Sequence, residues 1–277
     1  MNRKKILSLL LSVGLVTSSN AVLSENKSNT TEKKPATTPA PQKVVNEKAI
    51  ALEAMNIMSE HLRSLEKYTV NSEISFDEVL DSGQKLFLTK QVEIRAEHPT
   101  NLWVKTSMMN RIQRQFYFDG KTFTVYTPNL GLYASFDAPV TIGKVVREAR
   151  KKYDIELPIA DLFLWGADNE TSIDEAMIIG VDKVNGVSCN HFAFREKNVD
   201  WQICIQRGGE PLPLKLIIND RSVENQTKYV AIMKWDTAPT LDGQSYTFTP
   251  KEGEYKINFK QKTKQAVKTR QSTNANK

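Results

Sequence analysis

The stretch GVDKVNGVSCNHFAFREKNVDWQICIQRGGEPLPLKLII, residues 180–218, decides the fold. Apolar and polar residues alternate along it, which is the pattern of strands that bury one face. Turn-forming residues interrupt the alternation at Asn185-Gly186, at residues 197–200 and at residues 208–211. The stretch therefore predicts three consecutive antiparallel strands.

The same two-residue period occurs over much of the chain. It predicts strands at residues 68–80, 85–97, 101–109, 112–118, 122–127 and 131–136, then from about residue 176 through residue 235, and again within residues 246–259. Between Phe118 and Lys121, the dipeptide Asp119-Gly120 favours a tight hairpin, because a type I′ turn needs positive φ at both central positions.

Helical periodicity occurs in three places. Residues 44–67 repeat apolar side chains at helical spacing, and residues 140–153 place Ile142, Val145, Val146 and Ala149 on one face. Pro158 begins a short third helix, since proline is tolerated in the first turn, and this helix is almost entirely apolar from Leu162 to Trp165.

These elements predict an α+β fold. An antiparallel sheet of about ten strands twists and must curl, close or be covered. The available cover is the amphipathic first helix and the apolar pair that follows the first six strands. We therefore expect a strongly curved sheet, an incomplete β-barrel, wrapped over a few helices with an apolar space between them.

The N-terminus has the features of an export signal. A basic start at residues 2–5, an apolar stretch at residues 6–16 and the small residues Ser19 and Ala21 predict a signal peptide over residues 1–21. An uncleaved membrane anchor is the alternative, but it needs about 20 apolar residues. Both cysteines lie far downstream, so no lipid-modified cysteine follows the signal, and we expect a soluble mature protein in a Gram-negative periplasm.

Composition divides the remainder into a linker, a folded domain and a tail. Residues 22–46 are rich in Ser, Thr, Asn, Pro and Lys and are expected to be disordered. Residues 47–259 form the predicted domain, of a size that suits a single core, and residues 260–277 a basic disordered tail. That tail either contacts anionic groups or remains solvated.

The positive charge of the chain belongs to its ends. The chain has 38 basic and 32 acidic residues, a net charge of +6. Without Arg3, Lys4 and Lys5 the net charge is +3, and without the seven basic residues from Lys256 onward it falls to −4. A mildly acidic body gives no support for nucleic-acid binding.

No catalytic or metal motif is recognisable. The chain lacks the phosphate-binding, dinucleotide-binding, nucleophile-elbow and HExxH patterns. His61, His98 and His191 are not spaced with Cys, Asp or Glu as a zinc site requires. We therefore predict no catalytic residue, no metal and no cofactor.

Cys189 and Cys204 lie on adjacent strands of one predicted hairpin. In an oxidising compartment they can form a disulfide, provided that their Cα atoms come within about 7 Å. The apparent turn places them diagonally rather than directly opposite, so two reduced, buried thiols are the alternative.

Aromatic and apolar side chains are the main candidates for a binding site. Each of them serves either ordinary packing or the lining of a ligand cavity. The candidate cavity residues are Trp103, Phe116, Phe118, Phe123, Tyr126, Phe136, Leu162, Phe163, Trp165 and Trp201.

Three segments carry a resemblance to a known family. They are residues 180–191, written GVDKVNGVSCNH, then Asp200-Trp201-Gln202-Ile203, then residues 211–216, written PLPLKL. They resemble the predicted periplasmic family called domain of unknown function 2092, which is similar to the LolA/LolB-like lipoprotein carriers. The resemblance covers about residues 47–259 and implies a half-barrel with helices over a hydrophobic cavity.

The resemblance also implies a function. We expect a non-enzymatic, monomeric periplasmic protein that binds a lipid or lipoprotein acyl chain in the cavity. The alternative is an interaction or sensor module that contacts another envelope protein, since fold alone does not fix function.

Overall fold

The computed structural model describes residues 46–108, 113–138, 140–159, 164 and 173–260. All of these residues fall within one compact unit, residues 45–277. The predicted signal peptide, most of the linker and nearly all of the basic tail lie outside the described residues, as does the third predicted helix apart from Pro158, Ile159 and Leu164.

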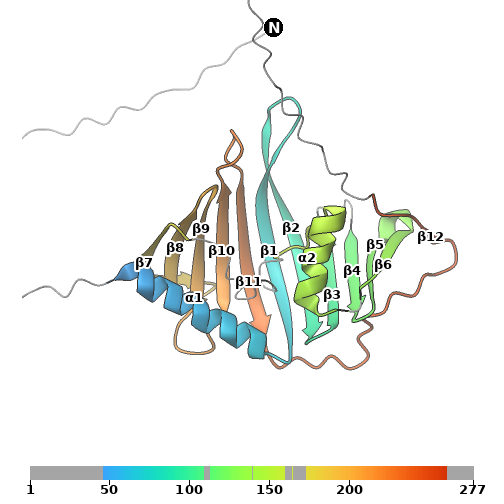
Figure 1. Ribbon diagram of the computed structural model, residues 1–277, viewed down its shortest axis with the longest axis horizontal. Helices are drawn as coiled ribbons and strands as arrows, with labels where there is room; N and C mark the ends of the chain where they lie inside the picture. Colours follow the sequence, from blue (N-terminus) through green and yellow to red (C-terminus); the bar gives the residue numbers. More distant parts are fainter. Residues whose placement is uncertain (1–45, 109–112, 139, 160–163, 165–172, 261–277) are drawn as a thin grey trace, which may run out of the picture. The chain divides into compact units, whose positions relative to one another are not determined.

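Twelve strands form one sheet in the described part of the chain (Figure 1). In chain order they are β1 (Lys67–Val79), β2 (Lys85–Glu97), β3 (Asn101–Ser107), β4 (Arg114–Asp119), β5 (Thr122–Thr127), β6 (Leu132–Asp137), β7 (Glu175–Val184), β8 (Val187–Glu196), β9 (Val199–Gln206), β10 (Pro213–Asp220), β11 (Lys228–Asp236) and β12 (Tyr255–Lys256). The spatial order is β12-β6-β5-β4-β3-β2-β1-β11-β10-β9-β8-β7. The sheet is therefore two meanders joined where β1 pairs with β11.

The predicted fold class is confirmed, with corrections of detail. The sheet is open and curved, and it has more strands than the ten expected. The pattern within residues 246–259 gives only β12, which pairs with β6 in parallel. The rest of that segment forms no ladder: Phe248 packs on the outer face of the sheet, and beyond β12 Phe259 packs against Phe136 and Tyr153.

Helix α1 (Glu47–Ser64) lies across the half of the sheet that contains β7 to β11 (Figure 1). Its side chains Ala51, Met55, Met58 and Leu62 are buried in the core. Asn46 caps its first turn by accepting a hydrogen bond from the Ala49 N–H at 3.1 Å. No helix in the described part of the chain is long and apolar enough to cross a membrane.

Helix α2 (Ile142–Tyr153) lies over the other half, near β2 and β3 (Figure 1). Ile142, Val145, Val146 and Ala149, the four residues of the predicted apolar face, are all buried. Both helices contribute to one core cluster with residues of the sheet. The sheet therefore has an inner face toward the helices and an outer face away from them.

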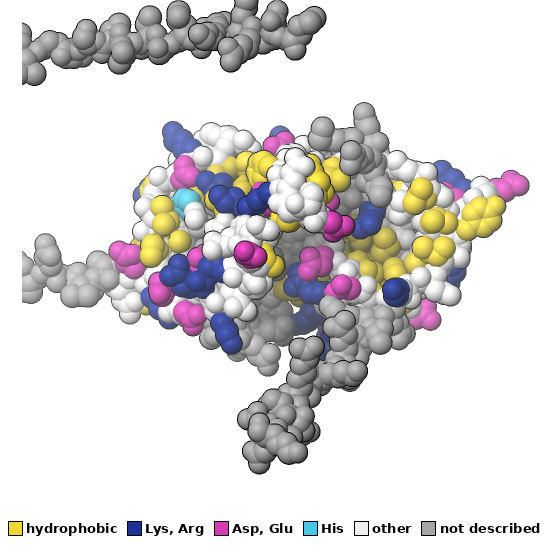
Figure 2. Space-filling view, turned by 90° about the horizontal axis from the view of Figure 1, so that it is seen from above, with side chains coloured by type: hydrophobic (Ala, Val, Ile, Leu, Met, Phe, Trp, Pro, Cys, Tyr) yellow, Lys and Arg dark blue, Asp and Glu magenta, His cyan; other side chains and the backbone are white. Residues whose placement is uncertain are grey.

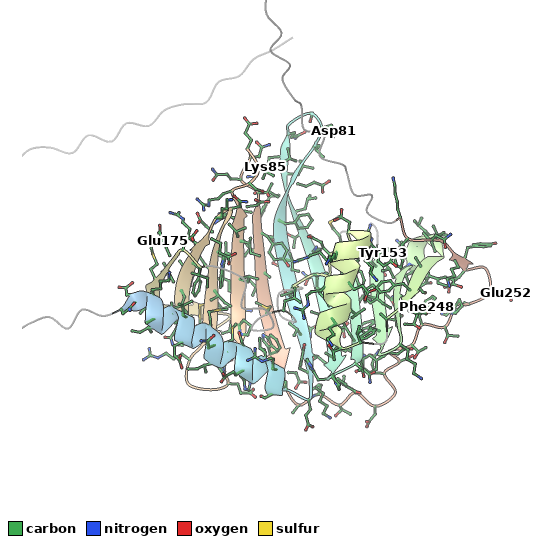
Figure 3. All side chains as sticks on the ribbon, viewed as in Figure 1. Asp81, Lys85, Tyr153, Glu175, Phe248 and Glu252 are labelled. Atoms are coloured by element: carbon green, nitrogen blue, oxygen red, sulfur yellow. A yellow bond between two sulfur atoms is a disulfide. The ribbon has the colours of Figure 1, made fainter. Side chains whose placement is uncertain are left out.

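The outer face of β4, β5 and β6 is covered by the segment that follows β11. Phe248 of this segment lies over that part of the sheet (Figure 3), and its ring contacts Tyr117, Tyr126 and Tyr133 at centroid distances of 5.4, 4.8 and 5.0 Å. The backbone N–H of Tyr255 then donates to Gly131 O at 2.8 Å. These contacts hold the segment along the sheet until β12 joins the edge at β6.

Candidate ligand-binding surface

One row of apolar side chains crosses the inner face over six adjacent strands. Strand register places each member directly opposite the next, from β8 through β9, β10, β11 and β1 to β2. We call it the rim row, and its members are Phe194, Trp201, Ile218, Tyr229, Phe76 and Leu88. At about 4.8 Å between strands, the row spans about 24 Å.

The rim row differs in burial from the row beside it. The neighbouring row, which we call the buried row, consists of Phe192, Ile203, Leu216, Ala231, Ile74 and Lys90. Its apolar members are at most 3% exposed. In the rim row only Phe194 is buried, whereas the other five are half-buried. The rim row is thus the accessible margin of the core on the inner face.

Trp201 is held firmly within the rim row. Its ring stacks on Phe194 with centroids 4.1 Å apart and an interplanar angle of 16°. Its indole N–H donates to Glu196 Oε1 at 2.9 Å, which satisfies the polar end of the ring. The result is a fixed flat apolar surface at the margin of the core.

The structure divides the ten candidate cavity residues between several environments. Trp201 belongs to the rim row, while Phe116, Phe118 and Phe123 are buried in the core on the α2 side. Phe136 is half-buried, with its ring 4.8 Å from that of Tyr153. Leu162, Phe163 and Trp165 lie outside the described residues.

Trp103 and Tyr126 lie on the outer face and so cannot line an inner cavity. Trp103 on β3 lies opposite Arg95 on β2, and the Arg95 guanidinium lies 4.9 Å from the centre of the Trp103 ring. Tyr126 donates to Glu254, and this hydrogen bond raises the pKa of Tyr126 to about 12. Alternation in the sequence shows that such residues share a face with their second neighbours, but it does not show which face turns inward.

Five members of the rim row are not among the predicted cavity residues: Phe194, Phe76, Leu88, Ile218 and Tyr229. Each lies in an alternating stretch, which was the only local signal available. The rim row forms only because β1 pairs with β11, and the paired residues are more than 150 positions apart in the chain. That pairing has no counterpart in local sequence.

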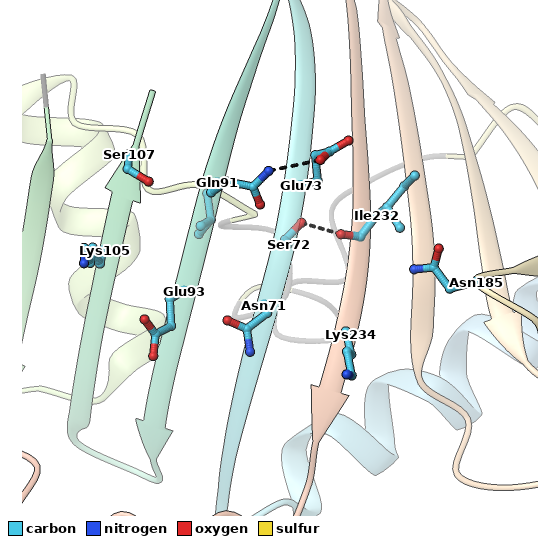
Figure 4. Close-up of a pocket in the computed structure, with 11 residues that line it drawn as sticks. Asn71, Ser72, Glu73, Gln91, Glu93, Lys105, Ser107, Asn185, Ile232 and Lys234 are labelled. Atoms are coloured by element: carbon cyan, nitrogen blue, oxygen red, sulfur yellow. Dashed lines mark hydrogen bonds between the residues drawn. The ribbon is translucent and has the colours of Figure 1, made fainter. Parts of the chain in front are cut away.

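Two pockets are lined by described residues, and neither has a member of the rim row in its lining. One, of about 280 Å³, is on the outer face (Figure 4) and is lined by Asn71, Ser72, Glu73, Gln91, Val92, Glu93, Lys105, Ser107, Asn185, Ile232 and Lys234. Some of its lining residues already bond to one another: Gln91 donates to Glu73 at 3.0 Å, and Ser72 donates to Ile232 O at 2.8 Å.

The second pocket lies at the end of the sheet where the β1–β2 and β10–β11 hairpins turn. It has a volume of about 690 Å³ and is lined by Asp77, Lys85, Phe87, Asp200, Asn219, Arg221, Asn225, Gln226 and Lys228. Seen from this end, basic and acidic side chains are interspersed with hydrophobic ones and form no field of a single sign (Figure 2). This mixture gives no strong preference for a polyanion.

Cys189 and Cys204 form a disulfide on the outer face, with their Cα atoms 5.4 Å apart. The register is diagonal, as expected, because Cys189 lies opposite Gln206 and Cys204 opposite His191. The diagonal did not prevent the bond, because strand twist brings one diagonal pair of positions within the distance that a disulfide spans.

One group of metal-ligating types occurs among the described residues. Ligand atoms of Asp182, His191 and Cys204 lie within 4.8 Å of one another. However, the Cys204 sulfur is bonded to Cys189, and the Asp182 carboxylate accepts a hydrogen bond from Lys215 Nζ at 2.9 Å, which lowers the pKa of Asp182. In this state the group offers no thiolate and no free carboxylate to an ion.

Comparison with known proteins gives the family. None of the curated proteins compared matches the sequence. Several solved structures are similar at low identity. LppX, a lipoprotein of Mycobacterium tuberculosis, has 10% identity and a TM-score of 0.43 over 70% of this chain and 99% of that one. A LolA-superfamily protein of Nitrosomonas europaea has 10% identity and a TM-score of 0.34 over 69% and 94%.

The complex of MucA and MucB from Pseudomonas aeruginosa is also similar, with 14% identity and a TM-score of 0.38 over 70% of this chain and 59% of the matched one. The family model matches far more directly, since it covers residues 51–260 and therefore most of the chain. The predicted family is confirmed: this protein belongs to the family described as predicted periplasmic protein, domain of unknown function 2092.

Proposed function

We propose that this protein is a non-enzymatic periplasmic binding protein that holds the acyl chain of a lipid or lipoprotein against the rim row. The observation that carries the proposal is the rim row itself: a continuous apolar surface, half-buried, on the helix side of a curved sheet. An acyl chain is long, narrow and wholly apolar, and burial of its methylene groups provides about 0.8 kcal/mol each.

The family and the N-terminus support the periplasm as the place of action. The family is described as predicted periplasmic, and residues 1–21 have the features of a cleaved signal peptide. N-terminal sequencing of protein recovered from the periplasmic and membrane fractions tests the cleavage. A mature chain that begins at Val22 supports it, and an intact Met1 in a membrane fraction contradicts it.

Bound lipid provides the main test. Protein purified from the periplasm is examined by native mass spectrometry, and a fluorescent fatty-acid probe is then titrated into delipidated protein. We expect a bound species of lipid mass and saturable probe binding. Absence of both would exclude the proposed function.

Two substitutions on β10 test whether the probe binds the inner face of the sheet and not the outer face. Ile218→Ser changes the rim row, whereas Ile217→Ser changes the adjacent outer-face position, which pairs with Gln202 and Val230. Both residues are half-buried, so the two variants are matched in position and burial. We expect probe affinity to fall for Ile218→Ser and to remain near that of the parent for Ile217→Ser.

A second candidate function is contact with another envelope protein through β7, the strand at one edge of the sheet, where the Ile178 N–H already donates to Glu47 Oε2 at 3.2 Å. Strand β7 pairs only with β8 among the described strands, and Met177, Ile179 and Val181 are 47%, 52% and 61% exposed. An exposed apolar edge strand is a surface to which another strand can add. Crosslinking of envelope fractions distinguishes this function, since a stoichiometric protein partner without lipid favours it. Ile179→Lys should then abolish capture.

A further inference from the structure

Lys90 is the one charged residue in the buried row. It lies on β2 directly opposite Ile74, whose side chain is fully buried. Its ammonium group lies 5.0 Å from the centre of the Phe76 ring, so it shares the inner face with the rim row. The position two residues earlier on β2 is Leu88, the last member of the rim row.

The charge of Lys90 is poorly compensated. No carboxylate of the described residues forms an ion pair with it. Burial lowers the pKa of Lys90, and the positive charge of Arg114 lowers it further, while Glu156 opposes these effects. The Glu156 side chain is 74% exposed and lies 3.7 Å from Arg150 Nε, so solvent and a second cation both weaken its influence.

Arg114 adds a second cation to the same region. It is the first residue of β4 and lies opposite Thr106, which in turn lies opposite Val92, two positions beyond Lys90 on the inner face. Two like charges beside an apolar surface destabilise each other, and an anion between them removes that cost. The aromatic face of Phe76 compensates only part of the charge.

We propose that Lys90, assisted by Arg114, binds the anionic headgroup of an amphiphile whose apolar chain lies along the rim row. This inference rests on the proposed function and names the class of ligand: a long-chain carboxylate or phosphate monoester. Both headgroups share an anionic oxygen that accepts a charge-assisted hydrogen bond from an ammonium group. The apolar row and the cation at its end match the two parts of such a molecule.

The experiment compares ligands that share a chain and differ in charge. Full-length protein is delipidated, and the dissociation constants of hexadecanoate, its methyl ester, hexadecyl phosphate and inorganic phosphate are measured by probe displacement and calorimetry. We expect both anionic amphiphiles to bind about ten-fold more tightly than the methyl ester, because a hydrogen bond to a charged group contributes enough binding free energy for a change of that size. Inorganic phosphate should bind too weakly to measure, because it lacks the chain.

Variants test whether Lys90 is responsible. Lys90→Gln should make the anionic amphiphiles and the ester bind equally, and Lys90→Arg should retain most of the preference. Lys105→Gln is the matched control, because Lys105 lies on the outer face of β3 opposite Glu93. Arg114→Gln should reduce the preference by a smaller factor. Circular dichroism and thermal unfolding confirm that each variant folds.

Each contrary outcome has a distinct meaning. If the ester binds the parent as tightly as hexadecanoate does, the headgroup site is wrong while the proposed function stands. If no amphiphile binds, the proposed function itself fails. Inorganic phosphate that binds as well as hexadecyl phosphate, or a preference that survives in Lys90→Gln, also overturns the inference. A preference for only one of the two anions identifies the headgroup within the proposed class.

Discussion

The ring of Phe248 lies 4.8 Å from that of Tyr126, although the two residues are more than 120 positions apart. Tyr126 also donates a hydrogen bond to Glu254, so one strand residue holds the segment after β11 at two points. Two further hydrogen bonds hold it: Arg95 donates to Gln244 Oε1 at 2.6 Å, and the Thr247 hydroxyl donates to Asp119 Oδ2 at 2.9 Å. The segment is therefore an integral cover of the outer face.

Phe248→Ala should loosen this cover. The side chain is half-buried and contacts three rings, each aromatic pair contributing about 0.5–1.5 kcal/mol, so we expect a loss of about 2 kcal/mol in the free energy of unfolding. Urea denaturation measures the loss, and limited proteolysis should show earlier cleavage within residues 240–258. Tyr255→Ala is the control, because Tyr255 is 66% exposed. An equal effect of both substitutions would contradict the role given to Phe248.

Gly120→Ala should destabilise the hairpin between β4 and β5. Gly120 has φ of +83°, and a Cβ atom there would lie 2.9 Å from Thr100 Cβ. The left-handed conformation alone costs an L-residue about 1–2 kcal/mol. Gly83→Ala is the matched control, since Gly83 has φ of +79° with nothing within 4 Å of the added atom. Urea denaturation should show the larger loss for Gly120→Ala, and equal losses would show that the contact with Thr100 is unimportant.

Local sequence predicted the strands well but the faces of the sheet poorly. Residues 85–97 and 122–127 form strands with the predicted bounds, because alternation and turn residues act within a few positions. Trp103 and Phe116 both occur in alternating stretches, yet Trp103 lies on the outer face and Phe116 in the core. The face that turns inward depends on where the helices pack, which a single strand does not encode.

The rim row could not be predicted from local sequence for a related reason. Phe76 and Tyr229 meet only when β1 pairs with β11, and that register arises from the whole sheet. Trp201 is among the predicted cavity residues, since it is a large aromatic residue in an alternating stretch, between the polar residues Asp200 and Gln202. Lys90 is not, because a lysine in an alternating strand usually faces solvent, and only the pairing with Ile74 places it on the inner face.

Loss of the disulfide should destabilise the protein without unfolding it. The bond joins residues 15 positions apart, and closing a loop of that size provides about 3 kcal/mol by restricting the unfolded chain. Urea denaturation of the Cys189→Ser, Cys204→Ser double variant, compared with the oxidised parent, measures the difference. Two thiols that titrate in denatured, unreduced parent protein would contradict the bond. A double variant as stable as the parent would contradict its contribution.

Mild acid should destabilise the fold through two histidines. Burial lowers the pKa of His98, and burial followed by the nearby charge of Lys215 lowers the pKa of His191 against the opposing effects of Asp182 and Gln202. Between these lowered values and the unfolded pKa of about 6.5, the unfolded chain binds more protons than the folded one. Stability is therefore fully present above about pH 6.5 and is lost as the pH falls toward the folded pKa values.

Urea denaturation at pH 7, 6 and 5 measures this loss. Because both imidazoles are partly solvated, we expect a decrease of less than about 1 kcal/mol for each histidine. The His98→Gln, His191→Gln double variant should show a flatter profile whatever its absolute stability, since only the slope reports protonation. The range ends at pH 5 so that Asp119 remains ionised: burial raises the pKa of Asp119, but hydrogen bonds from Thr122, Lys121 and Thr247 outweigh that effect and lower it. A slope unchanged in the double variant would assign the acid sensitivity to other groups.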